Sequence, residues 1–127
     1  QFFCEKIKLY FSRLASNKDE NPVVFQIKEY LHQNYAVPSL SVPDISEHVR
    51  LSPTYVCTLF KNETGQTLNQ YLTDYRIKMS KQFLSDPLYK ITDISAKVGY
   101  SDGNYYSKAF RKIVGLSPSK YREKMLR

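Results

Sequence analysis

Residues 91–102 read Ile-Thr-Asp-Ile-Ser-Ala-Lys-Val-Gly-Tyr-Ser-Asp, and residues 42–53 repeat this pattern as Val-Pro-Asp-Ile-Ser-Glu-His-Val-Arg-Leu-Ser-Pro. The identical positions of these two stretches lie 49 residues apart. Beyond them the offset becomes 50, because one residue has been inserted near Asp102-Gly103. The matches that follow at this offset are Tyr55/Tyr105, Phe60/Phe110, Gly65/Gly115 and Tyr71/Tyr121. Matches that keep their order over about fifty residues indicate one structural unit present twice.

Each copy of the unit predicts a short helix, a tight turn and a longer helix. In the first copy, Ser41 opens the short helix, and Ser52 followed by Pro53 opens the longer one. Serine is a preferred N-cap and proline suits the first helical turn. In the second copy, Gly99 supplies the left-handed residue after the short helix. This order is that of a helix-turn-helix.

A long helix is predicted between the copies. Thr67 and Gln70 form a capping box ahead of apolar side chains at helical spacing, which predicts a helix over 67–85. Further helices are predicted at about 23–35 and after Ser117. We therefore expect an all-α, homeodomain-like fold of about seven helices, with two helix-turn-helix subdomains joined by a long linker helix. The predicted segments are a helical connector from an upstream domain at 1–21, the first unit at 22–66, the linker helix at 67–86 and the second unit at 87–127.

The composition suits one compact domain or two small ones, and it is basic. The chain has 127 residues, 19 Lys and Arg, 12 Asp and Glu, and a net charge of +7. Residues 76–127 hold twelve of the basic and four of the acidic residues, whereas 22–75 hold three and five. A basic half favours a polyanionic partner, although scattered lysines are also typical of a solvated surface. No apolar stretch approaches the roughly 20 residues that cross a bilayer, so we expect no membrane contact.

The sequence lacks the patterns that indicate catalysis or metal binding. Cys4 and Cys57 form no C-x-x-C motif, and neither His32 nor His48 stands at metal-ligand spacing from them. No Ser/His/Asp order, paired carboxylates or phosphate-cradling glycine loop is present. We expect no enzyme activity, no cofactor and no metal, and a reducing, cytoplasmic compartment.

The two longer helices, at about 53–63 and 102–114, have matching faces. The side chains predicted to pack inward are Tyr55, Val56, Leu59 and Phe60 in the first and Tyr105, Tyr106, Ala109 and Phe110 in the second. The opposite faces carry short polar and cationic side chains, which suit base edges in a DNA major groove. For one isolated helix, an ordinary solvated face is the better interpretation. The duplication and the basic second half reverse that preference.

Residues 91–112 of the second unit, with 115–118 and Tyr121-Arg122, closely resemble the signature of AraC-type transcription regulators. Residues 51–61 and 63–65 of the first unit, and the linker's Tyr71-Leu72 and Arg76-Ile77, also resemble that family. The similarity covers roughly 22–126. It implies a bacterial regulator whose two recognition helices enter successive major grooves of double-stranded DNA at a promoter or operator.

The candidate DNA contacts follow from the helix faces and from this resemblance. The base-reading candidates are Thr54, Cys57, Thr58, Gly103, Asn104, Ser107 and Lys108. The phosphate candidates are Ser52, Lys61, Ser101, Arg111 and Lys112. Asn104 suits adenine, Lys108 suits guanine, and the threonines suit thymine methyl groups. Because Thr58 stands where relatives carry Arg, we expect softer readout by the first helix, with more dependence on DNA shape.

Cys57 has two interpretations. Its place on the predicted DNA face allows a redox-sensitive contact, but a small buried or half-buried packing side chain is favoured, because reactivity needs a lowered thiol pKa.

Residues 1–21 lie outside the repeat, and the opening suggests a piece of a longer polypeptide. Phe3, Ile7, Tyr10 and Leu14 have heptad-like spacing. This leaves open a homodimer through this segment and a helix end from an upstream domain. Among AraC-type chains, such a connector resembles the joint to a response regulator's receiver or to a membrane sensor. RNA polymerase is a further expected partner.

Two other functions remain open. A helical protein-interaction module without sequence-specific DNA readout is the main alternative. RNA binding is a third, although the sequence predicts no sheet with exposed aromatic side chains on which bases could stack.

Overall fold

The computed structural model describes residues 20–126, and this part of the chain consists of seven helices and no strand. The helices are α2 (Pro22–Asn34), α3 (Val42–Val49), α4 (Pro53–Thr64), α5 (Leu68–Leu84), α6 (Ile91–Lys97), α7 (Gly103–Val114) and α8 (Pro118–Met125). The all-α prediction with about seven helices is confirmed. The heptad-like side chains before residue 20 lie outside the described residues.

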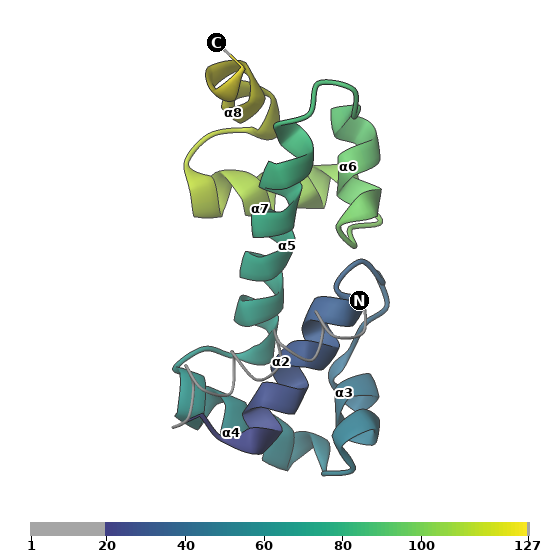
Figure 1. Ribbon diagram of the computed structural model, residues 1–127, viewed down its shortest axis with the longest axis vertical. Helices are drawn as coiled ribbons and strands as arrows, with labels where there is room; N and C mark the ends of the chain where they lie inside the picture. The colour runs from purple at the N-terminus through teal and green to yellow at the C-terminus, as the bar shows by residue number, and fades with distance from the viewer. Residues whose placement is uncertain (1–19, 127) are drawn as a thin grey trace, which may run out of the picture.

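Helix α5 runs between two helical units (Figure 1). Helices α2, α3 and α4 pack at one end of it, and α6, α7 and α8 pack at the other. The first core contains Ile27, Leu31, Val56, Phe60 and Leu72, and the second contains Ile77, Leu84, Ile94, Tyr106 and Phe110. Helix α5 thus contributes Leu72 to one core and Ile77 to the other.

Polar side chains cap the helices where the sequence predicts them. At α5, the Gln70 N–H donates to Thr67 Oγ1 at 3.1 Å, and the Thr67 N–H donates to Gln70 Oε1 at 2.9 Å. Ser52 accepts from the Tyr55 N–H at 3.2 Å at the start of α4. These caps satisfy backbone N–H groups that have no partner inside the helix.

The turn between short and long helix has the same form in both units. Arg50 in the first (φ 60°) and Gly99 in the second (φ 97°) are left-handed. The next residue then donates its N–H back into the short helix, from Leu51 to Ser46 O at 3.2 Å and from Tyr100 to Ser95 O at 2.9 Å.

The structure changes two details of the predicted elements. Helix α5 has 17 residues instead of 19, which at about 1.5 Å per residue gives a length of roughly 26 Å. The N-cap of α7 is Asp102, whose Oδ1 accepts from the Asn104 N–H at 2.9 Å. Helix α7 therefore begins at Gly103, one residue after the predicted start at about 102. Within residues 20–126, no helix has the length and apolar character needed to span a membrane.

Candidate nucleic-acid interface

Helix α4 presents one buried and one exposed face. Val56 and Phe60 are fully buried in the first core. All the predicted contact residues at this helix are exposed, namely Ser52, Thr54, Cys57, Thr58 and Lys61. Two of them also serve the helix itself, because Ser52 caps its start and Lys61 Nζ donates to Gly65 O at 3.0 Å at its end.

Helix α7 repeats this arrangement in the second unit. Tyr106 and Phe110 are buried at the positions that match Val56 and Phe60. All the predicted contact residues here are likewise exposed, namely Ser101, Gly103, Asn104, Ser107, Lys108, Arg111 and Lys112. The structure therefore gives both helices an exposed polar face at equivalent positions.

Tyr55 and Tyr105 do not pack inward as predicted. The two side chains are 52% and 63% exposed. They precede the buried Val56 and Tyr106 by one residue, which turns them about 100° away from the core. Both long helices thus offer a phenol beside Thr54 and Asn104, at positions the sequence analysis assigned to the core.

The sequence favoured a buried or half-buried packing role for Cys57. The structure contradicts this interpretation. Its thiol is free and exposed on α4. It matches Ser107 of α7, so both recognition-helix candidates carry a small side chain at this position.

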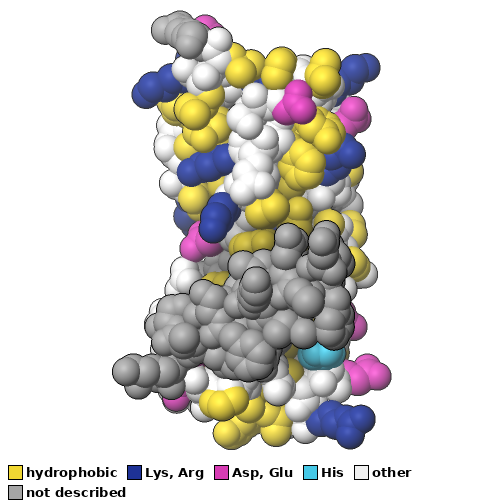
Figure 2. Space-filling model, viewed as in Figure 1, with side chains coloured by type: hydrophobic (Ala, Val, Ile, Leu, Met, Phe, Trp, Pro, Cys, Tyr) yellow, Lys and Arg dark blue, Asp and Glu magenta, His cyan; other side chains and the backbone are white. Residues whose placement is uncertain are grey.

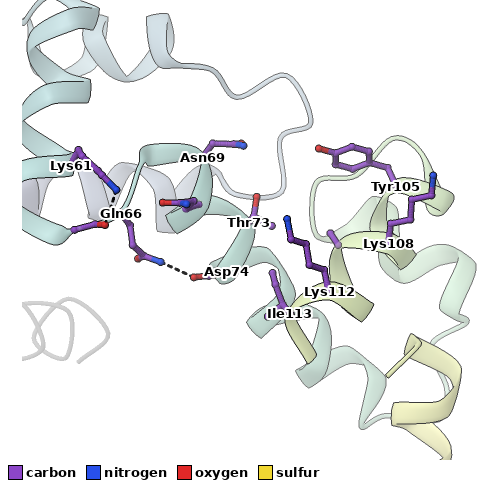
Figure 3. A pocket seen from close by; sticks show the side chains of 12 residues that line it. Lys61, Gln66, Asn69, Thr73, Asp74, Tyr105, Lys108, Lys112 and Ile113 are labelled. Carbon is purple, nitrogen blue, oxygen red and sulfur yellow. Dashed lines mark hydrogen bonds between the residues drawn. The ribbon is translucent and has the colours of Figure 1, made fainter. Parts of the chain in front are cut away.

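A groove of about 670 Å³ lies between the two exposed faces. Lys61 stands at one end of it, and Tyr105, Lys108 and Lys112 of α7 stand at the other (Figure 3). The wall between them comes from Gln66, just before α5, and from Asn69, Gln70, Thr73 and Asp74 in the first two turns of that helix. Gln66 Nε2 donates to Asp74 Oδ2 at 2.9 Å, so the one carboxylate of the groove is hydrogen-bonded. The groove joins predicted contact residues of both units.

The positive charge lies mainly over the second unit. On the visible part of the face in Figure 2, Lys and Arg side chains line both edges of the upper half. Lys108, Arg111 and Lys112 form no ion pair within the described residues 20–126. Helix α7 therefore presents three cations that form no salt bridge with a carboxylate of residues 20–126, which suits attraction to phosphate.

The polar residues of α5 that line the groove were not predicted from the sequence. Asn69, Gln70 and Thr73 share a face of that helix at spacings of one, three and four residues. That spacing was available from the sequence. The position of Lys108 and Lys112 opposite them was not, because it depends on how α7 packs against α5.

Comparison with known proteins gives consistent matches. A family model described as "Helix-turn-helix domain" matches residues 45–124. The Msm operon regulatory protein of Streptococcus mutans is 36% identical over 110 residues, which cover 87% of this chain and 39% of the relative. The chain therefore spans about two-fifths of the length of that relative.

Solved structures have the same fold. The C-terminal domain of AraT, a response regulator from Geobacillus stearothermophilus, matches with a TM-score of 0.79 and 29% identity, covering 82% of this chain and 86% of that one. The DNA-binding domain of AdpA in complex with a target DNA matches with a TM-score of 0.75 and 17% identity, covering 82% and 93%. At 17% identity, the second likeness concerns the fold alone.

Proposed function

Because this chain belongs to the AraC-type helix-turn-helix family, we propose that it binds double-stranded DNA sequence-specifically and regulates transcription. Helices α4 and α7 are the two recognition helices, and they enter successive major grooves on one face of the duplex. The observation that carries this proposal is the pair of equivalent exposed polar faces at the two ends of α5.

The exposed side chains divide into two roles by chemistry. Base edges are read by Thr54, Cys57 and Thr58 of α4 and by Gly103, Asn104, Ser107 and Lys108 of α7. Phosphates are bound by Ser52, Lys61, Ser101, Arg111 and Lys112. Amide, hydroxyl and methyl groups suit base edges, whereas cations and capping hydroxyls suit the DNA backbone. The basic α7 supplies more of the salt-dependent affinity, and α4 contributes mainly sequence preference.

The length of α5 bears on the shape of the bound DNA. Its roughly 26 Å compares with the roughly 34 Å between major grooves one turn apart on a straight duplex. A duplex bent toward the protein brings those grooves closer together. Bending favours sequences that deform easily, which adds specificity at base pairs that no side chain touches.

The remaining features of the whole protein follow from the same proposal. The parts of the chain are a connector at 1–21, a first unit at 22–66, a linker helix at 67–86 and a second unit at 87–127. The protein acts in the bacterial cytoplasm, without catalysis, as the output part of a longer regulator such as a response regulator. RNA polymerase and a second copy, joined through the upstream segment, are its protein partners.

DNA titration of matched variants tests this function. A duplex selected from a random pool with the unaltered chain is compared with a scrambled duplex at several salt concentrations. Asn104→Ala should lower the preference for the selected duplex by about 5- to 150-fold, because one good base contact is worth about 1–3 kcal/mol. Lys112→Ala should weaken binding to both duplexes and reduce the salt slope by about one.

Two outcomes would contradict the proposal. If the unaltered chain bound selected and scrambled DNA with equal affinity, sequence-specific binding would be ruled out. A double Asn104→Ala and Lys108→Ala variant that binds the selected duplex as well as the unaltered chain would favour the rival function, a helical protein-interaction module.

A further inference from the structure

The two units touch beside α5, at the end of α2 and the turn before α7. The α2–α3 connection faces the α6–α7 turn in Figure 1. At this contact a Cβ atom on Gly99 would collide with the carbonyl oxygen of Tyr35 and with the side chain of Arg76. Gly99 also has φ 97°, a conformation that glycine adopts readily. The backbone of the second unit therefore lies directly against the backbone of the first.

Arg76 of α5 joins both sides of this contact. Its Nε donates to Tyr35 O at 2.8 Å, and its Nη2 donates to Val37 O at 2.9 Å. Both acceptors lie just after the end of α2, in the first unit. The guanidinium carbon also lies 5.5 Å from the ring centre of Tyr100, in the second unit. One planar cation thus holds two carbonyls of one unit and an aromatic ring of the other.

In the second unit, Arg122 binds two backbone carbonyls in the same way, but both belong to its own side of the molecule. Arg122 of α8 donates from Nε to Leu84 O at 3.0 Å and from Nη2 to Asp86 O at 3.2 Å, at the end of α5. Arg122 follows Gly115 by seven residues, whereas Arg76 follows Gly65 by eleven. The difference of four residues is about one helical turn. Arg76 therefore sits one turn further from its own unit and reaches the neighbouring one.

Partial burial gives this bridge a fixed geometry. Arg76 is half-buried, and burial lowers the pKa of its guanidinium from the usual value. A planar group held by two directional hydrogen bonds and a ring has little rotational freedom. Tyr35 also packs against Tyr75 of α5, with ring centres 5.2 Å apart at 77°. The end of α2 is thus fixed to α5 from two directions.

We propose that Arg76 is a positioning residue that locks the orientation of α7 relative to α4 and thereby sets the spacing between half-sites that the domain accepts. This inference rests on the proposed function for its consequence on DNA. Its structural part concerns the protein alone. Without the bridge the units stay joined through α5, but the angle between them varies and a wider range of spacings is tolerated.

A distance measurement on the free protein tests the structural part. Spin labels are attached to Cys57 and to a cysteine introduced by Ser107→Cys, which are exposed and equivalent positions of α4 and α7. Cys4→Ser removes the other thiol. Arg76→Gln should broaden the distribution of label distances about twofold or more. The matched control Arg122→Gln also loses two hydrogen bonds to backbone carbonyls. It should leave the width of the label-distance distribution unchanged. An unchanged width in folded Arg76→Gln would overturn the proposal.

Binding to duplexes of altered spacing tests the consequence. Two base pairs are inserted between the half-sites of a selected duplex, which shifts one half-site by about 7 Å and rotates it by about 70°. The unaltered chain and Arg122→Gln should lose about 30-fold or more in affinity, because one helix loses its base contacts. Arg76→Gln should lose less than about 5-fold. A loss as large as that of the unaltered chain would overturn the proposed effect on spacing.

The two experiments separate the two proposals. If no duplex can be selected, the proposed function fails while the distance measurement still decides the role of Arg76. If circular dichroism shows that Arg76→Gln does not fold, Arg76→Lys is measured in its place. Lysine keeps the positive charge and one donor group but lacks the planar guanidinium that binds two carbonyls at once. A distance distribution in Arg76→Lys as narrow as in the unaltered chain would then count against the proposal.

Discussion

Arg50 has a left-handed backbone conformation, and the residue at the equivalent turn of the second unit is Gly99. Left-handed φ and ψ cost a side-chain-bearing residue roughly 1–2 kcal/mol, and glycine's larger entropy in the unfolded chain offsets part of this difference. Because Arg50 is exposed and has φ 60°, Arg50→Gly should raise the free energy of unfolding by about 0.5–1 kcal/mol. Urea unfolding followed by circular dichroism measures the change.

The reverse exchange in the second unit is its control. Gly99→Ala introduces a Cβ atom at φ 97° that collides with Tyr35 O, so stability should fall by about 2 kcal/mol or more. A destabilised Arg50→Gly, or a Gly99→Ala variant as stable as the unaltered chain, would contradict this account of the two turns.

At the scale of single elements, the start of α5 depends on a reciprocal pair of side-chain hydrogen bonds. Thr67→Ala removes the acceptor for the Gln70 N–H and should lower the free energy of unfolding by about 1 kcal/mol. Asn69→Ala, on the exposed side of the same turn, is the matched control and should change stability by less than about 0.5 kcal/mol. Equal urea midpoints for the two variants would show that the cap is energetically unimportant.

The helices themselves could be predicted from such local signals. Ser41, Ser52, Thr67 and Ser117 each precede a helix, as the sequence indicated, because capping is decided within four residues of chain. The inserted residue before α7 obscured the register by one position. As a result α7 begins at Gly103 rather than at 102, with Asp102 as its N-cap.

The faces of the helices were harder to predict. Tyrosine is both apolar and hydrogen-bonding, so Tyr55 and Tyr105 fitted the inner face by type while their positions turn them outward. The bridge of Arg76 to the end of α2 spans 41 residues of sequence. No periodicity within one helix could have indicated that contact, because it arises only when the two units pack.

At the scale of the whole molecule, buried phenols make stability depend on alkaline pH. Burial raises the pKa of Tyr35, Tyr100 and Tyr106 above the usual value near 10. The unfolded chain therefore releases these protons at lower pH than the folded one. The stabilisation is fully present below about pH 10 and is lost as pH rises through the folded-state values.

Urea unfolding between pH 8 and pH 11, with tyrosinate absorbance at 295 nm, checks this behaviour. The free energy of unfolding should decline above about pH 10, and Tyr106→Phe should reduce the decline. A free energy that stays constant to pH 11 would contradict the assignment of buried neutral phenols.

Because α5 packs in both cores, the two units should not unfold independently, although they lie at opposite ends of that helix. Leu72 packs in the first core and Ile77 in the second, although they are only five positions apart in the sequence. If either core opened, half of α5 would lose its packing, and a helical remnant shorter than about 12–15 residues is marginal in water. Melting of one unit therefore removes the support of the other. The two copies should denature together in a single cooperative transition, as one thermodynamic domain built from a duplicated unit.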